Sequence, residues 1–482
     1  MKKQDNNITR RDFIKTSSAG LAGAAILASP LGPLAAKALA ATPPNLAVEK
    51  GATLNVLRWS VFVQGDKDLW EANCRKWEQA TGCKVVNEYV SWEDVRPKAA
   101  MSAAVGAGPD LVSGWHDDPH LYPDKLLDVS DVAEYLGAKY GGWEEACIKY
   151  GQKDGRWIAI PMGAPGQQIV YRKSWVDEAG YSEFPKTTDE FIKLSKKLNS
   201  MGHPVGFALG HSVGDGNNFA YTWLWSYGAS TVDADGNPAI DSPETRAALD
   251  GMKELYSAMI PGCASWLDPH NNKSYLAGQI AMTNNGISIY VAAKGKPELK
   301  EIADDTYHAE LPIGPVGIPT QLHLFNQAFI FKHTAAPNAA KHFLMFMLEK
   351  EQAAPWTEAM VGYVTPGLDA YRDLPIWTSD PKNTAYRDCV KNMKWNGYPG
   401  PIGPGSAAVM AEYVVVDMFA NYCARDMAAD EVIARAEKAI ARAYRKYIGF
   451  LSTNRNQRGR LQKLPRPPSI ILITPDIYYF AQ

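Results

Sequence analysis

Aromatic and acidic side chains recur in three loops that follow the predicted strands of the N-terminal region. Trp59, Trp92 and Trp115 each stand at or just beyond the end of a strand, and Asp117 and Asp118 follow the third strand. An indole ring can stack on the C–H face of a sugar and donate from its N–H, and a carboxylate can accept two hydroxyl groups at once. These residue types predict a site for a small polyhydroxylated solute.

The hydrophobic spacing around these residues predicts alternating strands and helices. We expect strands over 53–57, 83–90 and 111–113, with helices over 66–80 and 93–105 between them. A β-α-β-α-β order indicates an α/β protein with a parallel sheet and helices on both faces. Ligands bind beyond the carboxyl ends of such strands, which is where the tryptophans and aspartates lie.

The rest of the chain continues this α/β pattern. We expect further helices over 189–199, 248–259, 335–349 and 430–448. About 440 residues remain after a predicted leader, which is long for one hydrophobic core and favours two domains.

The first residues have the pattern of an export signal. Arg10 and Arg11 form a twin-arginine pair, an apolar stretch follows, and small residues end at Ala40. This order predicts a signal peptide over 1–40, recognised by the twin-arginine translocase and cleaved near Ala40, and a periplasmic mature chain. Because this route carries folded proteins, often with cofactors, a redox enzyme stays an alternative.

Charge and cysteine usage exclude several classes of function. The chain has a net charge of −2 and a basic leader, so the mature part is acidic and a poor candidate for binding nucleic acid. The six cysteines form no CxxC or Cys/His cluster, so we expect no metal and no cofactor. Cys74 and Cys83 could close a disulfide in an oxidising compartment, and buried free thiols are the alternative.

Motifs of common enzymes do not occur in the sequence. There is no GxSxG, HExxH, P-loop or strand-associated GxGxxG. Asp117 and Asp118 are adjacent, which does not suit the carboxylate separation of roughly 5–10 Å that glycosidases need. We therefore expect a binding protein, with a secreted enzyme as the disfavoured alternative.

Five sequence blocks resemble, in order, those of the extracellular solute-binding proteins of ABC importers, in the carbohydrate-binding group typified by maltose-binding protein. The blocks are KWEQATGCKV at 76–85, GAGPDLV at 106–112, the YRK…AG…PKT segment at 171–187, GQIAM…NG at 278–286, and the helix with its GYVTP loop at 337–366. The resemblance extends over roughly 53–448.

The resemblance implies a two-lobed fold of type II, each lobe a mostly parallel sheet flanked by helices, with ligand in the cleft between them. The implied units are 41–161 with 312–350 as lobe 1, 162–311 with 351–449 as lobe 2, and 450–482 as a disordered tail. The chain would cross between lobes near Pro161, near Pro312 and again over 349–356. Closure of the cleft by hinge bending is the implied mechanism.

The implied function is capture of a small carbohydrate or polyol and delivery to the transmembrane subunits of an ABC permease, by a monomer. A polyamine or another small solute in the same fold is the alternative ligand, because acidic and aromatic residues also suit a cation. A sensor kinase is the alternative partner.

The resemblance also assigns site residues in the N-terminal loops. Trp59 matches a cleft aromatic of the family, with core packing as its alternative. Asp117 matches a ligand-binding carboxylate, whereas His116 is expected to be structural. Asp118 stands where the family has a basic residue, and capping of a helix is its alternative. Trp92 and Trp115 complete the expected aromatic set.

Four further residues are expected at the cleft. Trp223 lies in a block that lines the second lobe, although core packing is favoured for it. Asn285 either reaches the ligand or holds an Asn-Gly turn, Gln167 lies near the first crossover, and Asn326 near the return crossover. Ile287 replaces a tryptophan of maltose-binding protein, so specificity for malto-oligosaccharides does not transfer.

Overall fold

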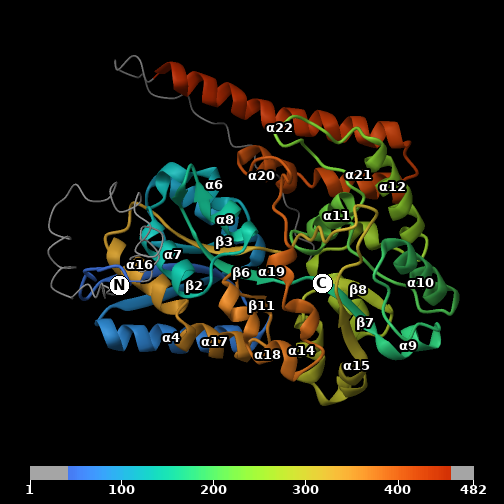
Figure 1. Ribbon diagram of the computed structural model, residues 1–482, viewed down its shortest axis with the longest axis horizontal. Coiled ribbons are helices and arrows are strands. Elements are labelled where there is room, and N and C mark those ends of the chain that lie inside the picture. Colours follow the sequence, from blue (N-terminus) through green and yellow to red (C-terminus); the bar gives the residue numbers. More distant parts are fainter. Residues whose placement is uncertain (1–41, 458–482) are drawn as a thin grey trace, which may run out of the picture.

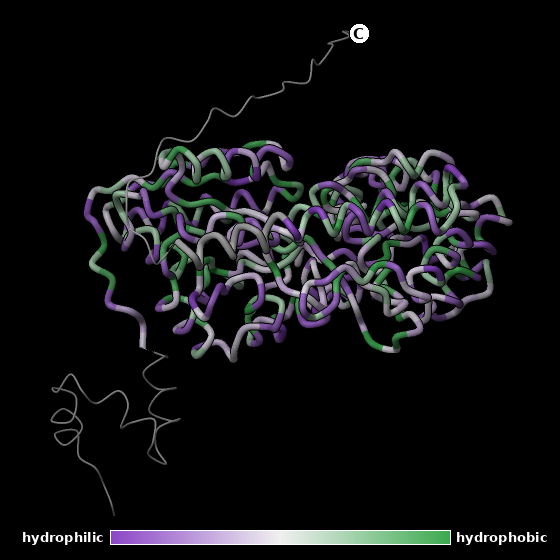
Figure 2. The backbone as a smooth tube through the Cα atoms, turned by 90° about the horizontal axis from the view of Figure 1, so that it is seen from above, coloured by the Kyte–Doolittle hydropathy of each residue, from purple (hydrophilic) through white to green (hydrophobic). Residues whose placement is uncertain are grey.

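Two lobes lie side by side in the computed structural model, which describes residues 42–457 of the 482-residue chain (Figure 1). Viewed from above, the backbone is elongated and narrows between its two halves (Figure 2). The predicted signal peptide and residues 458–482 of the predicted tail lie outside the described residues. Residues 450–457 belong to the last helix, so the helical part extends beyond the expected boundary at 449.

The first lobe is built on a six-stranded sheet in the order β11-β6-β10-β3-β1-β2. Its strands are β1 (Thr53–Trp59), β2 (Lys84–Val90), β3 (Leu111–Trp115), β6 (Ile160–Pro165), β10 (Asn326–Ile330) and β11 (Val364–Thr365). β1 pairs in parallel with β2 and β3, which confirms the predicted βαβαβ unit. β10 runs antiparallel to β3 and β6, and β11 antiparallel to β6, so the whole sheet is mixed.

Helices cover both faces of this sheet. They are α4 (Gln64–Thr81), α5 (Val95–Val105), α6 (Asp118–Leu121), α7 (Ser130–Lys139), α8 (Glu145–Gly151), α16 (Pro337–Met347) and α17 (Lys350–Ala359). Alternation along β1 sends Leu54 and Val56 into a core with α4 and α16, and Leu57 and Trp59 into a smaller core with α5. α4 ends where Gly82 adopts φ 74°, a left-handed conformation that glycine adopts without strain.

The second lobe contains a three-stranded sheet in the order β8-β7-β9. Its strands are β7 (Gln168–Arg172), β8 (Met282–Asn285) and β9 (Thr306–Ala309). Both pairings are antiparallel, because the chain leaves the first lobe along β7 and runs in the opposite direction along β8 and β9. The expectation of a mostly parallel sheet in each lobe is therefore wrong for this lobe.

Helices provide most of the second lobe, and its core is the largest in the protein. They are α9 (Lys173–Glu178), α10 (Thr188–Ser200), α11 (Asp215–Ser226), α12 (Pro243–Tyr256), α13 (Asp268–Leu276), α20 (Pro404–Ala411), α21 (Val414–Ala424) and α22 (Ala429–Gln457). The hydroxyls of Thr187 and Ser242 accept backbone N–H groups at the starts of α10 and α12. α22 packs along α20 and α21 (Figure 1).

The remaining elements lie near the junction of the lobes or form small hairpins. They are α14 (Ser288–Lys294), α15 (Lys300–Asp305), α18 (Ile376–Ser379), α19 (Cys389–Asn392), β4 (Gln152–Lys153) and β5 (Arg156–Trp157). In α19, Cys389 packs into the first-lobe core and Val390 into the second-lobe core.

The last crossover lies later in the chain than expected. Residues 351–389 were assigned to the second lobe, but α17 packs on α4 and β11 pairs with β6 of the first-lobe sheet. The indole N–H of Trp356 donates to the carbonyl and carboxylate of Asp66, at 3.1 and 2.8 Å, which fixes α17 on the first lobe. The chain passes to the second core at α19 instead of near 349–356.

The structure decides between the two states that the sequence leaves open for the cysteines. All six cysteines are buried free thiols, so the alternative to a Cys74–Cys83 disulfide holds. Among the described helices, the stretch Pro404–Ala424 is long and apolar enough to cross a membrane, but half of it is buried inside the protein.

Candidate functional site

A narrow cavity of about 40 Å³ lies between the two lobes, next to the first crossover. Its lining residues come from the first lobe, the crossovers and the second lobe: Phe62, Trp92, Leu324, Pro165, Gln167, Tyr363, Gly286, Asn285, Ser288, Gly214, Asp215, Asp268 and Asn272. The position between lobes, the apolar walls and the convergent polar groups are typical of a small-molecule site, and the narrow space requires the lobes to open before a sugar-sized ligand enters.

The first-lobe wall of the cavity is aromatic. Trp92, just beyond the end of β2, lines the cavity and is 8% exposed. Its ring lies 3.9 Å from that of Trp115 and 5.7 Å from that of Trp59, between ring centroids. Phe62 approaches Trp92 from the solvent side, with the ring centroids 5.5 Å apart. Trp59 and Trp115 thus hold Trp92 in place from behind and do not line the cavity.

The Trp92 indole N–H has no hydrogen-bond partner in the described protein. Buried polar groups are nearly always paired, so an orphaned donor beside a cavity calls for an explanation. The Trp92 carbonyl, in contrast, accepts the indole N–H of Trp115 at 3.4 Å.

The opposite wall carries two aspartates, Asp215 at the start of α11 and Asp268 at the start of α13. Asp268 accepts the backbone N–H groups of Val213, Gly214 and Asp215 at 2.8–3.1 Å, and the Ser212 hydroxyl. It therefore fixes the N-terminus of α11, where the helix dipole favours an anion.

Amides bind the second carboxylate of this wall. Asp215 accepts the side-chain amides of Gln167 and Asn271, the latter at 2.6 Å. The side-chain carbonyl of Gln167 accepts the side-chain NH₂ of Asn218. The backbone N–H of Gln167 donates to Nδ1 of His323 at 3.1 Å. The wall is thus a continuous and rigid network that joins the crossover to α11.

Burial changes the protonation behaviour of both aspartates. Burial and the neighbouring Asp268 hold the pKa of Asp215 well above its ordinary value, against the opposing effect of the Asn271 and Gln167 amides. Burial also raises the pKa of Asp268, and Glu93 adds to the effect. Perturbed carboxyl groups in a cavity are frequent at functional sites.

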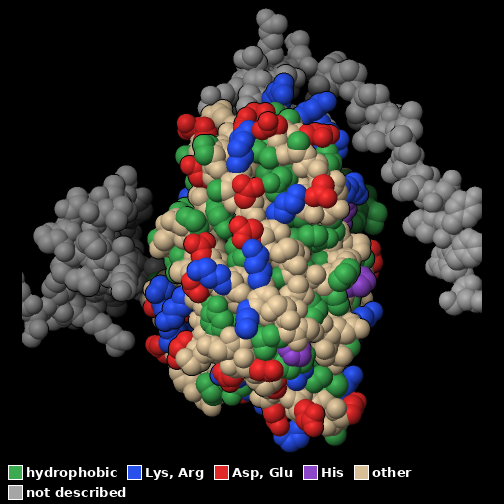
Figure 3. Space-filling view, turned by 90° about the vertical axis from the view of Figure 1, so that its right-hand side faces the viewer, with side chains coloured by type: hydrophobic (Ala, Val, Ile, Leu, Met, Phe, Trp, Pro, Cys, Tyr) green, Lys and Arg blue, Asp and Glu red, His purple; other side chains and the backbone are tan. Residues whose placement is uncertain are grey.

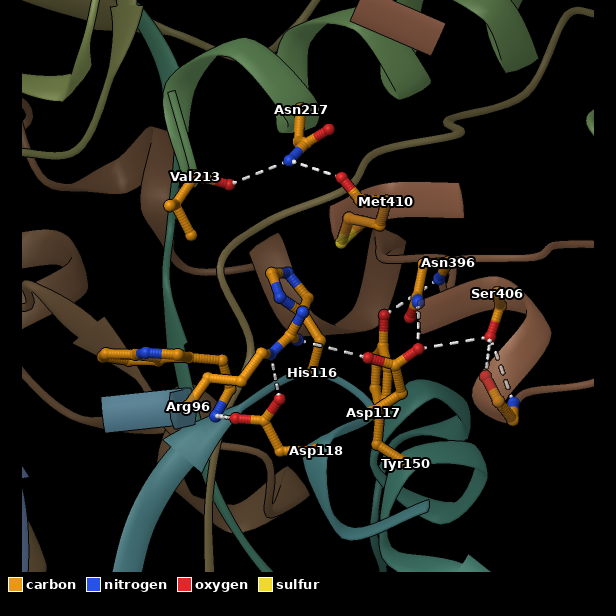
Figure 4. A network of polar contacts seen from close by, with 12 residues as sticks. Arg96, His116, Asp117, Asp118, Tyr150, Val213, Asn217, Asn396, Ser406 and Met410 are labelled. Atoms are coloured by element: carbon orange, nitrogen blue, oxygen red, sulfur yellow. Dashed lines mark hydrogen bonds and ion pairs between the residues drawn. The ribbon is translucent and has the colours of Figure 1, made fainter. Parts of the chain in front are cut away.

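A second acidic pair, Asp117 and Asp118, lies elsewhere on the interface between the lobes (Figure 4). Both side chains are fully buried, and Arg96 from α5 binds both, with its Nη2 3.4 Å from Asp117 Oδ1. Asp118 also accepts the Trp115 backbone N–H at 3.0 Å.

Two residues of the C-terminal segment reach Asp117 from the other lobe. The Asn396 amide donates to Asp117, and the Ser406 hydroxyl lies 3.2 Å from the same oxygen (Figure 4). The Asn396 backbone N–H donates to the Tyr150 hydroxyl at 2.9 Å. Asp117 therefore joins the first lobe to the segment that leads into α20.

Burial raises the pKa of Asp117 to about 6, although Arg96 and the Asn396 amide oppose the shift. His116 precedes it with a left-handed φ of 34°, and its Nε2–H donates to the carbonyl of His323, 3.0 Å away. Burial lowers the pKa of His116 to about 3, so it is neutral and structural, as expected.

The structure brings three of the nine predicted site residues to the cavity, Trp92, Gln167 and Asn285. Asn285 also stabilises its own turn, because its side-chain oxygen accepts the Gly286 N–H at 2.6 Å. Asp117 faces the lobe interface, Asp118 has its contacts within the first lobe, and neither lines the cavity.

The other predicted residues occupy different surroundings. Asn326 donates to the Gly114 carbonyl at 3.1 Å, and together with Trp59 it lines a separate small cavity in the first lobe. Trp223 is 3% exposed in the second-lobe core, where its N–H donates to the Ala248 carbonyl at 3.0 Å. This is the core-packing alternative for Trp223.

Sequence reasoning missed several lining residues, namely Phe62, Asp215, Asp268, Asn272, Ser288 and Tyr363. One signal could have found the acidic pair, because Asp215 follows a glycine and Asp268 precedes Pro269, both at helix starts. Nothing in their spacing places the two side by side, since 53 residues separate them.

Comparisons with known proteins agree with this arrangement. The sequence profile of the bacterial extracellular solute-binding protein family matches residues 72–385. A Brucella abortus protein named as a binding protein is 24% identical over 284 residues, which are 56% of this chain and 66% of that relative. The diacetylchitobiose binding protein DasA of Streptomyces coelicolor is 31% identical over 151 residues, 31% of this chain and 34% of the relative.

The fold is also that of a solved solute-binding protein. The tagatose-bound solute-binding protein of Thermotoga lettingae superimposes with a TM-score of 0.68 at 16% identity, covering 82% of this chain and 100% of that protein. The two lobes, their crossovers and the cavity between them therefore correspond to the two-lobed architecture of periplasmic binding proteins.

Proposed function

The chain belongs to the bacterial extracellular solute-binding protein family, and from this premise we propose that it is the substrate-binding component of an ABC transporter that captures a small sugar or polyol. The ligand would occupy the cavity between the lobes and be delivered to the transmembrane permease subunits. The proteins whose names carry a ligand, for diacetylchitobiose and tagatose, support this class of solute.

The observation that carries the proposal is the composition of the cavity wall. Trp92, Phe62 and Tyr363 offer apolar faces, and Gln167, Asn285 and their neighbours offer hydrogen-bonding groups. Sugars and polyols need both, because their C–H faces are apolar and their hydroxyls donate and accept.

We propose different roles for the predicted site residues. Trp92, Gln167 and Asn285 would contact the ligand, and Trp59 and Trp115 would position Trp92. Asp117 and Asp118 would act at the closing surface of the lobes instead of in the cavity. Hinge bending about the crossovers would then open and close the site.

The proposal also includes the export of the protein, its location and its oligomeric state. Residues 1–40 would direct export by the twin-arginine translocase, with cleavage near Ala40, and place the mature protein in the periplasm as a monomer. The protein would bind its solute without transforming it, in keeping with the binding proteins of its family.

A thermal-shift screen of the mature protein tests this function. A sugar or polyol at 100 times its Kd should stabilise the fold by about 2.7 kcal/mol. Trp92→Ala should raise the Kd of the ligand found in the screen about tenfold or more. Met101→Ala, on the exposed side of α5, should leave this Kd unchanged. If no sugar or polyol shifts the melting, the function is wrong, and if Trp92→Ala binds normally, the site is wrong.

A polyamine is the second candidate ligand, and one observation favours it. The cavity wall holds Asp215 and Asp268, and among its lining residues there is no lysine, arginine or histidine. Putrescine and spermidine therefore belong in the same screen.

A further inference from the structure

The acidic pair of the cavity, Asp215 and Asp268, has only neutral hydrogen-bond donors. Asp268 is bound by backbone N–H groups and a serine hydroxyl, and Asp215 by two side-chain amides. No ion pair within 4 Å involves either carboxylate among residues 42–445.

Three other buried carboxylates of this protein have a cation, whereas Asp110 is bound only by Asn55 among the described residues. Arg58 lies 3.2 Å from Asp66, and Arg96 binds both Asp117 and Asp118. The surface at the far end of the second lobe likewise mixes cationic and anionic side chains (Figure 3). In the cavity wall, by contrast, the charged groups are all acidic.

The groups around the pair do not supply the missing charge. Glu93, next to Trp92, raises the pKa of Asp268 and so acts on it as a further negative charge. His323 contacts Gln167, but burial lowers its pKa to about 3 and leaves it neutral. A buried carboxylate without a cation is unfavourable, and a cation that enters the cavity would relieve this.

The aromatic wall supplies an independent indication of a cationic ligand. Trp92, Phe62 and Tyr363 line the same cavity, and a cation is attracted to the face of an aromatic ring. The Trp92 N–H is buried and has no partner in the described protein, so the ring itself is the part of Trp92 that lines the cavity.

Two polar groups of the cavity remain free for hydroxyls. The Ser288 hydroxyl and the Asn272 side-chain NH₂ make no hydrogen bond to the described protein. Both groups can form a hydrogen bond with a hydroxyl of a ligand, and both are uncharged. The cavity thus offers negative charge on one wall and neutral hydrogen-bonding groups beside it.

We propose that this cavity selects a hydroxylated ligand that carries a protonated amine, an amino sugar or amino alditol, over the uncharged analogue of the same shape. The inference rests on the proposed function and narrows it. The ammonium group lies against Asp215 and Asp268, and the hydroxyls meet Trp92, Ser288 and Asn272.

Matched ligand pairs test the charge requirement by calorimetry at one pH and salt concentration. The pairs are glucosamine with glucose, galactosamine with galactose, and chitobiose with N,N′-diacetylchitobiose. In at least one pair the amine should bind about tenfold more tightly, because charge-assisted hydrogen bonds are stronger than neutral ones. The inference is overturned if no amine binds more tightly than its neutral partner, or if putrescine binds more tightly than every amino sugar.

Two lysine substitutions keep the test independent of the folding of an acidic variant. Asn272→Lys places a cation of the protein beside the pair and should abolish the preference for the amine, whereas Met101→Lys, on the exposed side of α5, should keep it. Asp215→Asn should also abolish the preference. An amine preference that survives Asn272→Lys and Asp215→Asn contradicts the proposed site.

Proton uptake and release distinguish this inference from the general function. Binding of an ammonium group favours the ionised form of Asp215, so protons should be released, and the apparent enthalpy should depend on the buffer. A neutral sugar that binds with no proton release, and as tightly as its amine, overturns the inference but supports sugar capture. Absence of binding by every sugar, amine and polyol overturns both.

Discussion

The acidic pair Asp117 and Asp118 and the acidic pair of the cavity differ in the charge of their partners. Asp117 and Asp118 share Arg96, and Asn396 and Ser406 complete the shell of Asp117 from the other lobe. The cavity pair has amide, hydroxyl and backbone donors but no cation. A compensated pair serves to hold two lobes together, whereas an uncompensated pair beside a cavity is available to a ligand.

The acidic pair that the sequence suggests as a ligand site is not the pair that lines the cavity. Asp117 and Asp118 attract attention because they follow a strand and match a family motif. In the structure Asp117 binds residues of the other lobe and Asp118 binds within the first, whereas the cavity wall carries Asp215 and Asp268, which match no motif. Adjacent charges in a sequence therefore do not show whether a cation from another element lies beside them.

Removal of Arg96, which binds both Asp117 and Asp118, should change the free energy of unfolding most. Arg96→Met leaves two fully buried carboxylates without a cation, and we expect a loss of unfolding free energy of about 3 kcal/mol at pH 7. Urea denaturation measures it. Lys98→Met is the matched control on the same helix, where an exposed pair with Glu88 should contribute less than about 1 kcal/mol. Equal effects of the two substitutions would contradict the comparison.

The pH dependence of stability should separate the two pairs. The folded-state pKa of Asp117 is raised to about 6 from an ordinary value of 3.8, so the folded state binds more protons than the unfolded state between these values. Stability is therefore highest below pH 4 for this group and falls by at most about 3 kcal/mol as the pH rises through 6.

Asparagine variants measured from pH 4 to 8 assign this slope. Asp117→Asn should flatten the curve below about pH 6. Asp215→Asn should also flatten it, because burial and the neighbouring Asp268 hold the pKa of Asp215 well above its ordinary value. An unchanged slope in both variants would show that neither carboxyl is perturbed.

Ser406→Ala should have a smaller effect, specific to the compensated pair. It removes one donor to Asp117 across the lobe interface, and we expect a loss of about 1.5 kcal/mol. Small-angle X-ray scattering of the ligand-free protein should also show a larger radius of gyration, because the closed lobes lose a contact. Ser257→Ala, on the exposed end of α12, is the control and should change neither quantity.

A substitution in the cavity pair should change the stability of the ligand-free protein least. Asp215→Asn should leave the ligand-free protein at pH 8 as stable as the wild type, or up to about 1 kcal/mol more stable, because a buried carboxyl no longer has to ionise. Thermal and urea denaturation without ligand measure this. A loss above about 2 kcal/mol would mean that Asp215 is compensated after all.

The sequence by itself determined the elements and the class of fold. Hydrophobic period and helix stops placed the first three strands and the helices between them to within a few residues, because these signals are local. Ordered motifs indicated the solute-binding family, and the profile match confirms it. Three cavity residues, Trp92, Gln167 and Asn285, were also found, since two of them lie at strand ends and one near the crossover.

Only the tertiary structure decided which charges meet. Arg96 reaches Asp117 across 21 residues of sequence and Asn396 reaches it across 279, whereas Asp268 approaches the N-terminus of α11 across 53. The sequence patterns likewise do not predict the late crossover at α19 or the antiparallel sheet of the second lobe. Local patterns report burial and backbone conformation, but the pairing of charges depends on which distant segments the packed lobes bring together.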